Sequence, residues 1–239
     1  MYKKYAAAMA ASAILAAPTS AFAIGVELGL VIDGSGSISS NDFGDQKTSY
    51  TAALQTFFDQ NPGKFGDVAI GVWQFSATVQ QVIAPLLISS QLDLNALKSA
   101  ISGMNQIGST TNIGGGINAA RVSLLGNSIT SDRQVIDVST DGFHNTGLDP
   151  NTEVPNALLA GIDAINCLGI GTSADWSFVT NPNPDAGFVV TSNDFTPAVL
   201  TPILISKIGR EVNGVPEPSS LALLGLAGLA FGYSRRRKV

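Results

Sequence analysis

The middle of the chain is predicted to adopt an α/β fold with a Rossmann-like, doubly wound and mostly parallel central sheet. One edge strand is expected to be antiparallel, and helices are expected on both faces. Two observations predict this fold. Short apolar runs typical of buried strands alternate with longer segments whose apolar residues recur at helical spacing. Strands that alternate with helices in this way form parallel sheets covered on both faces.

The first predicted strand is Val26–Ile32, and the segment Phe43–Gln60 follows as a helix with aromatic and aliphatic residues on one side. Val68–Phe75 is the second strand, and a short turn joins it to an antiparallel partner at Thr78–Ile83. The remaining predicted helices are Ser90–Met104, Asn112–Leu125, Pro155–Ile165 and Asp194–Val212, the last bent or interrupted near Pro202, and the remaining strands are Gln134–Val138, Leu168–Gly171 and Phe188–Thr191.

The first 23 residues are predicted to be a secretory signal peptide that does not belong to the fold. Lys3 and Lys4 form a positive start, and an apolar stretch rich in small residues follows them. Ala21-Phe22-Ala23 then provides the small-x-small pattern of a cleavage site. The mature chain is therefore expected to begin near Ile24.

The last residues combine three features in a fixed order. Val215-Pro216-Glu217-Pro218 precedes an uncharged apolar run over 221–233, and four cations follow at 235–238. As a helix the apolar run would span about 20 Å at 1.5 Å per residue. A comfortable membrane span needs roughly 20 apolar residues. We therefore expect a temporary anchor whose cations stay in the cytoplasm, which places the preceding domain outside.

This order of Pro/Glu motif, apolar helix and basic stop resembles the PEP-CTERM sorting signal of Gram-negative bacteria. The resemblance implies that residues 214–239 insert transiently in the inner membrane until an exosortase removes them. The domain at 24–213 would then be exported to the cell surface or the extracellular matrix. An ordinary C-terminal membrane tail is the alternative interpretation.

The domain between the two signals is strongly acidic. The whole chain has 13 Lys and Arg against 18 Asp and Glu, and the signals contain six of these cations and one of these acids. The domain therefore keeps 7 and 17, a net charge of −10. This charge argues against nucleic-acid binding and is compatible with divalent cations. Cys167 is the only cysteine, which excludes an internal disulfide, and its apolar neighbours predict a buried, unreactive thiol.

Three loops expected at one edge of the sheet are rich in oxygen donors. Residues 33–37 follow the first strand, residues 108–114 precede a helix, and residues 139–142 follow the strand Gln134–Val138. An open parallel sheet binds its ligands beyond the carboxyl ends of the strands, where the strand order reverses. Carboxylate and hydroxyl oxygens without thiol or imidazole suit Mg²⁺. Gly34 and Gly36 are expected to supply the backbone torsions that turn the first loop toward a common centre.

The three loops resemble the metal ion-dependent adhesion site (MIDAS) of von Willebrand factor A (VWA) domains. That site combines Asp-x-Ser-x-Ser with a distant Thr and a distant Asp. The resemblance extends over roughly Val26–Val212, and the stretch Arg133–Asn145 is similar to a bacterial VWA-like branch without an assigned function. The matching residues of this chain are Asp33, Ser35, Ser37, Thr111 and Asp141, with Thr110 replacing Thr111 if the loop register shifts by one.

The resemblance implies a divalent cation, Mg²⁺ or in its place Mn²⁺ or Ca²⁺, with one coordination position left for an acidic group. The predicted function is a non-enzymatic module that binds an acidic protein or polysaccharide through this metal. A structural matrix or assembly subunit with a purely stabilising metal is the alternative. An enzyme acting on an extracellular polymer is disfavoured, because no general acid and base pair is evident outside the metal loops.

The remaining candidate residues do not support other chemistries. His144 is the only histidine, and the lack of a second one argues against a zinc site. A serine hydrolase is also disfavoured, because Gly34-Ser35-Gly36 is not Gly-x-Ser-x-Gly and His144 would have to be the sole base. The chain has no Gly-x-x-x-x-Gly-Lys-Ser/Thr loop for a nucleotide. Trp73 is expected in the core, whereas Trp176 lies in a long loop where a contact role stays open.

Overall fold

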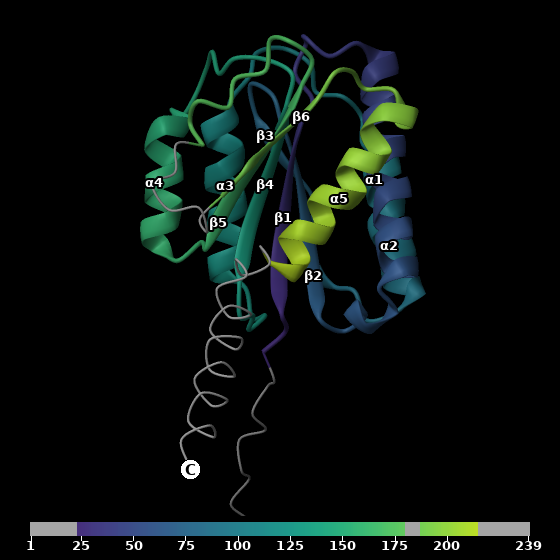
Figure 1. The fold of residues 1–239 in the computed structure, drawn as a ribbon. Coiled ribbons are helices and arrows are strands. Elements are labelled where there is room, and N and C mark those ends of the chain that lie inside the picture. The colour runs from purple at the N-terminus through teal and green to yellow at the C-terminus, as the bar shows by residue number, and fades with distance from the viewer. Residues whose placement is uncertain (1–22, 180–186, 215–239) are drawn as a thin grey trace, which may run out of the picture.

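The computed structural model describes residues 23–179 and 187–214, and its centre is a six-stranded sheet between two layers of helices (Figure 1). The strand order is β3-β2-β1-β4-β5-β6, with β2 and β3 antiparallel and every other neighbouring pair parallel. The predicted fold class is therefore confirmed. The elements are β1 (Val26–Asp33), α1 (Ser40–Gln60), a 3-10 turn (Pro62–Lys64), β2 (Val68–Phe75), β3 (Val79–Leu87), α2 (Gln91–Ser102), α3 (Ile113–Gly126), β4 (Gln134–Thr140), α4 (Pro150–Ala160), β5 (Ala164–Ile170), β6 (Val189–Ser192) and α5 (Pro197–Asn213).

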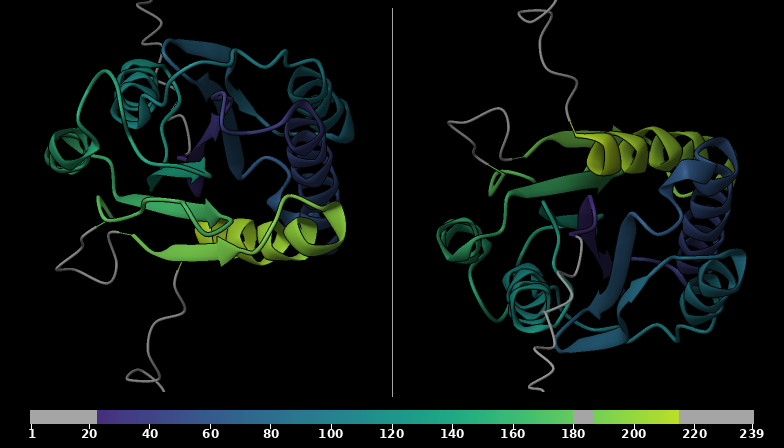
Figure 2. Two further views of the ribbon diagram at one scale, coloured as in Figure 1. Left: turned by 90° about the horizontal axis from the view of Figure 1, so that it is seen from above. Right: turned by 90° about the horizontal axis from the view of Figure 1, so that it is seen from below.

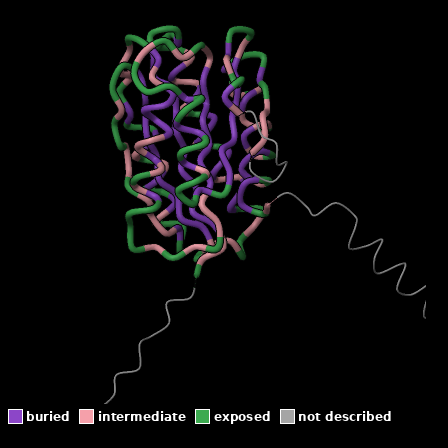
Figure 3. The backbone as a smooth tube through the Cα atoms, turned by 90° about the vertical axis from the view of Figure 1, so that its left-hand side faces the viewer, coloured by how far each residue is buried: buried purple, intermediate pink, exposed green. Residues whose placement is uncertain are grey.

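The sheet separates two hydrophobic clusters. Helices α1, α2 and α5 cover one face, and α3 and α4 cover the other (Figure 2). Along β1, Leu28, Leu30 and Ile32 belong to the first cluster, whereas Val31 belongs to the second. The strands β1, β2 and β5 are buried along their whole length because both faces of the sheet are covered. Figure 3 shows this buried backbone through the middle of the domain.

Polar caps set the beginnings of three helices. The side chain of Ser39 accepts a hydrogen bond from the Asp42 amide at the start of α1, and Ser90 does the same for Asp93 at α2. Asn112 accepts from the Gly115 amide at α3. Each cap satisfies an amide that has no partner within its own helix. The predicted helices began at or near these residues, so their existence and type are confirmed with small boundary shifts.

The predicted helix Pro155–Ile165 is misplaced in the chain. Helix α4 starts five residues earlier because Asp149 caps it and Pro150 occupies its first turn, where a missing N–H costs nothing. Gly161, with a φ of 117°, ends the helix in a left-handed conformation. The chain then turns into β5, which already begins at Ala164. Pro155 lies inside the helix and does not open it.

Two other elements that contain prolines also differ from the prediction. Helix α5 runs without interruption through Pro202, because the proline removes one hydrogen bond while Leu200, Leu204 and Ile208 stay fully buried. Strand β3 continues four residues past the predicted end at Ile83 and includes Pro85. An edge strand tolerates proline because its outward N–H groups need no partner in the sheet.

Two predictions about the core are confirmed. Trp73 is 2% exposed and packs in the cluster beneath α3 and α4. Cys167 is fully buried, and burial raises the pKa of its thiol to about 12, so the thiol stays protonated and unreactive.

The two predicted targeting segments lie outside the described residues, except for Ala23 and Gly214 at their inner ends. The predicted apolar helix over 221–233 is among the residues not described. Within the described ranges, no helix is both long enough and apolar enough to cross a membrane.

Candidate metal centre

The predicted site lies where the strand order reverses. Strands β1 and β4 are parallel neighbours at the centre of the sheet, with β2 beyond one of them and β5 beyond the other. Asp33 is the last residue of β1, and Asp141 directly follows β4. The carboxyl ends of both strands lie at the upper edge of the sheet in Figure 1, where parallel α/β sheets bind their ligands.

A chain of hydrogen bonds joins four of the five predicted residues. Ser37 Oγ donates to Asp141 Oδ1 at 2.7 Å, and the hydroxyl oxygens of Ser35 and Ser37 are 3.1 Å apart. Asp33 Oδ1 accepts from the Ser35 amide at 2.8 Å. Asp33 and Ser35 are fully buried, whereas Ser37 is exposed. The group therefore opens to solvent on the side of Ser37 and Asp141.

The fifth residue, Thr111, is held near this group through the backbone of its loop. The Gly36 amide donates to the Ser109 carbonyl at 2.8 Å, and the Gly108 amide donates to the Gly34 carbonyl at 2.8 Å. Thr111 is 4% exposed, whereas Thr110 is exposed, which favours Thr111 as an inward residue. Among the described residues, no hydrogen bond links the Thr111 hydroxyl to the other four side chains.

The two glycines of the first loop are needed for space, and the expected special torsions are absent. Neither Gly34 nor Gly36 has a positive φ. A Cβ atom on Gly34 would lie 2.3 Å from Gln74 Oε1, and one on Gly36 would lie 3.1 Å from the Ser109 carbonyl oxygen. The positive torsions occur instead in the facing loop, at Gly108 (φ 73°) and at Ser109 (φ 82°). Backbone strain at a non-glycine residue is typical of ligand sites.

The carboxylates of the site have no built-in counter-charge. Burial raises the pKa of Asp33 to about 6, and the charge of Asp141 adds to this rise against the hydrogen bonds from Ser35 and Thr140. Burial also raises the pKa of Asp141, with a smaller contribution from Asp42. No Lys, Arg or His among the described residues forms an ion pair with Asp33 or Asp141. A buried carboxylate beside a half-exposed one, with no basic partner for either in the described residues, fits a divalent cation.

Hydroxyl oxygens would have to supply the rest of the shell. In the described part of the chain, no three His, Cys, Asp or Glu side chains gather into a potential metal site. The donors that do gather are two carboxylates and the hydroxyls of Ser35 and Ser37. This set of hard oxygen donors suits Mg²⁺ and related cations.

Sequence reasoning missed two side chains that support the site. Thr140 Oγ1 donates to Asp33 Oδ2 at 2.7 Å and so ties β4 to β1. Gln106 Nε2 donates to the carbonyl oxygens of Ser35 and Ile38 at 3.0 and 2.8 Å and so braces the first loop. Thr140 precedes Asp141 directly, which was a usable signal. The sequence holds no signal for Gln106, because its partners lie about 70 residues away.

Exposed aromatic residues border the site. Phe143, two residues after Asp141, is 62% exposed, and Trp176 is 37% exposed. The Asp175 amide donates to the Gly142 carbonyl at 3.2 Å and holds the Trp176 loop against the loop after β4. A contact role for Trp176 therefore stays a prediction, on a loop that is bonded to the one after β4. His144 follows Phe143 and is partly buried there.

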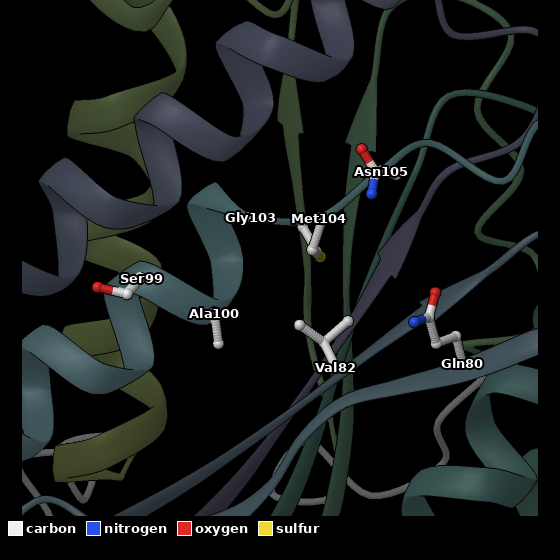
Figure 4. Close-up of a pocket in the computed structure, with 7 residues that line it drawn as sticks. All are labelled: Gln80, Val82, Ser99, Ala100, Gly103, Met104 and Asn105. Carbon is white, nitrogen blue, oxygen red and sulfur yellow. The ribbon is translucent and has the colours of Figure 1, made fainter.

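A separate hollow of about 290 Å³ lies between α2 and the edge strand β3 (Figure 4). None of its lining residues is charged, and none belongs to the five predicted ligands. The hollow therefore contributes no donor to the candidate metal centre. Its lining residues are Gln80, Val82, Ser99, Ala100, Gly103, Met104 and Asn105.

Comparison with known protein families assigns most of the chain to one family and its tail to a sorting motif. The family described as a protein of unknown function, DUF1194, matches residues 23–192. The chain belongs to the DUF1194 family. The PEP-CTERM protein-sorting motif matches residues 214–238 and confirms the resemblance of the tail to this sorting signal. This motif indicates export to the surface of a Gram-negative cell and implies processing by an exosortase. A search of curated protein sequences found no match.

Solved structures support the fold of this DUF1194 domain. Proximal thread matrix protein 1 from the mussel byssus is 22% identical with a TM-score of 0.63, over 78% of this chain and 48% of that one. A form of the mussel protein with a zinc-occupied MIDAS motif is 20% identical with a TM-score of 0.61, over 80% and 48%. The von Willebrand factor type A protein from Catenulispora acidiphila is 18% identical with a TM-score of 0.63, over 80% and 43%. The fold is therefore VWA-like, and the chain spans about half the length of the mussel protein.

Proposed function

We propose that this protein is an exported, non-enzymatic binding module that captures an acidic group through a divalent cation. The five residues of the candidate metal centre would hold the cation. The acidic group would belong to a protein or to a polymer of the extracellular matrix. The observation that carries the proposal is the buried Asp33, which lacks a counter-charge and lies beside Asp141 and two serine hydroxyls. The proposed ligands are Asp33, Ser35, Ser37, Thr111 and Asp141.

Each part of the site has a separate task in this proposal. The bound cation would supply a positive centre that attracts the partner's carboxylate. Ser37 and Asp141 face solvent, so the partner would approach from their side. Thr140 and Gln106 keep the first loop in place through the hydrogen bonds described above. The preformed arrangement keeps the ordering cost of binding small.

The comparisons support this proposal without naming a partner. The mussel protein carries zinc at the MIDAS motif of a similar fold, which favours a divalent cation here. We propose Mg²⁺ because the donors are hard oxygens, with Mn²⁺ or Ca²⁺ as substitutes. We further propose that residues 1–23 and 214–239 are removed, the latter after transient insertion in the inner membrane. The domain at 24–213 would then act at the cell surface or in the matrix.

Titration with Mg²⁺ during urea unfolding tests the metal. A cation that binds only the folded state stabilises it by about 2.7 kcal/mol at a concentration 100 times its Kd. We expect this rise in the wild type and none in Asp33→Ala. Asp59→Ala, which removes an exposed carboxylate from the far end of α1, should keep the full rise. The proposal fails if Mg²⁺ leaves the wild type unchanged or stabilises Asp33→Ala equally.

A structural matrix or assembly subunit is the second candidate, favoured by the likeness to a thread matrix protein. In that role the metal would tie the three loops together, and no acidic partner would compete for it. Capture of matrix material by the wild type, with and without EDTA, separates the two functions. Capture that EDTA and Asp33→Ala both abolish supports the binding module. Stabilisation by Mg²⁺ without any capture supports the structural role.

A further inference from the structure

A second group of charged side chains lies deep in the core between α5 and the sheet. Lys207 of α5 donates from its ammonium group to Asp137 Oδ1 on β4 and to Glu211 Oε1 one helical turn further on. Asn166 of β5 donates to Glu211 Oε1 at 3.0 Å. We call these four residues the α5 cluster. Each of them is at most 1% exposed.

The charges of the α5 cluster do not balance. It contains two carboxyl groups but one ammonium group, so full ionisation would leave one net negative charge in the core. One oxygen of each carboxyl group, Asp137 Oδ2 and Glu211 Oε2, is buried without a hydrogen-bond partner among the described residues. An uncompensated buried charge is costly, and buried acids commonly respond by keeping a proton. The two orphaned oxygens are the atoms that can hold it.

We propose that the α5 cluster binds one proton in the folded domain, shared between Asp137 and Glu211, and that this proton holds α5 on the sheet. With the proton in place, one carboxylate and one ammonium group remain, and the cluster is neutral. Loss of the proton leaves like charges close together beneath α5. The attachment of α5 therefore weakens as the pH rises.

Of the titratable groups in and around the cluster, only the carboxyl groups of Asp137 and Glu211 change their charge near neutral pH. Burial raises the pKa of Glu211, and so does the charge of Asp137, while burial also raises the pKa of Asp137. Burial by itself would lower the pKa of Lys207, but the charges of Asp137 and Glu211 raise it, so the ammonium persists. Tyr50 from α1 and Cys167 from β5 stay neutral because burial raises the pKa of both.

Two further cations lie near the cluster, and neither is bonded to its carboxyl oxygens in the described structure. Arg133 donates from Nη1 to the backbone carbonyl of Glu211 at 3.2 Å. Arg210 stacks over the Phe188 ring, 3.7 Å from its centroid, on the outer side of α5. Neither arginine forms an ion pair with Asp137 or Glu211 in the described structure. The proton is therefore the cluster's means of neutralising its second carboxyl group.

The sign of the pH effect follows from the raised pKa values. A carboxyl group with a higher pKa in the folded state binds more protons folded than unfolded. Its contribution to stability is therefore present at low pH and is lost as the pH rises through the folded pKa. An ordinary paired carboxylate, whose folded pKa is lowered, would show the opposite slope.

Urea unfolding of Glu211→Gln against the wild type between pH 5 and pH 8 tests the proposal. EDTA is present in every buffer, so the result does not depend on the candidate metal centre. Over this range we expect the unfolding constant of the wild type to rise at least about tenfold more than that of the variant. Asp137→Asn should flatten the profile in the same way, because either change leaves one carboxylate opposite Lys207. Glu153→Gln, on the other side of the sheet, should keep the wild-type profile.

Hydrogen exchange supplies a second readout that needs no variant. Between pH 6 and pH 8, protection of the α5 amides should fall relative to the α3 amides, after correction for intrinsic exchange. Equal pH profiles for the wild type and Glu211→Gln would overturn the proposal, as would unchanged α5 protection. If stability changes when choline chloride replaces NaCl but does not change with pH, the cluster binds a metal cation in place of the proton. That result would also overturn the proposal.

Discussion

Two acidic sites lie along β4 and directly after it, and they differ in the source of the positive charge that balances their carboxylates. Asp137 lies in its middle and faces Lys207, an internal cation from α5. Asp141 follows its end beside Asp33, and no described basic side chain pairs with either. The first site holds an internal counter-charge, whereas we propose that the second takes one from a bound cation. The presence or absence of an internal basic side chain therefore distinguishes a buried structural cluster from a candidate ligand site better than the number of acidic residues does.

Removing the internal cation should have the largest effect. Lys207→Met leaves Asp137 and Glu211 buried without an ammonium group, and breaking a buried pair from one side costs about 3–5 kcal/mol. Urea unfolding at pH 7 measures this loss. The control Lys98→Met removes a lysine whose contact with Gln55 lies at the surface of α1 and α2 and should cost less than about 1 kcal/mol. Similar costs for both variants would contradict the contrast between a buried and a surface cation.

The proposed external cation can be tested through the pH dependence of stability. Asp33 has a folded pKa of about 6 against an ordinary value of 3.8, so in EDTA its contribution to stability falls as the pH rises through this interval. The fall is about 3 kcal/mol at most, since one pKa unit corresponds to about 1.4 kcal/mol. Asp33→Asn should remove this part of the slope, and saturating Mg²⁺ should reduce it in the wild type. If neither Asp33→Asn nor Mg²⁺ changes the slope of stability against pH, the slope does not arise from Asp33.

The smallest effect concerns the close packing around the candidate site. Gly34→Ala would push a methyl group against Gln74, whose amide holds the Ile107 N–H and the Asn105 carbonyl, and should cost about 1–3 kcal/mol. The affinity of the Gly34→Ala variant for Mg²⁺ should fall as well. In contrast, Gly44→Ala meets open space inside α1 and should stabilise the domain by about 0.5–1 kcal/mol. A harmless Gly34→Ala would show that the first loop has room to move.

The two acidic sites also differ in how visible they are in the sequence. Asp33 and Asp141 stand in Gly/Ser/Thr loops directly after predicted strands, so the topology rule for parallel sheets brought them together. Lys207 and Glu211 are four residues apart on a helix, which is the ordinary spacing of a surface ion pair. Asp137 inside an apolar strand was the one available signal. Its partner on α5, 70 residues away, could not be inferred from spacing.

Within the fold, the sequence predicted which elements exist better than where they end. Hydrophobic periodicity depends on many residues and survives single exceptions, so every helix and strand of the sheet was expected. Boundaries depend on one or two residues, and the predicted helix start at Pro155 was wrong. The bend or interruption predicted near Pro202 is likewise absent. The cap at Asp149 and the left-handed Gly161 decided the true ends of α4.

By itself the sequence determined the alternation of strands and helices, the acidic character of the domain, its sorting motif and the oxygen donors of three loops, because these are properties of composition and local spacing. The tertiary structure alone decided that Gly34 and Gly36 serve close contact, that Thr140 ties Asp33 to β4, and that Lys207 is buried between two carboxyl groups. The physical reason is that burial and the nearest charge are set by residues distant in sequence, which meet only when the sheet and its helices pack.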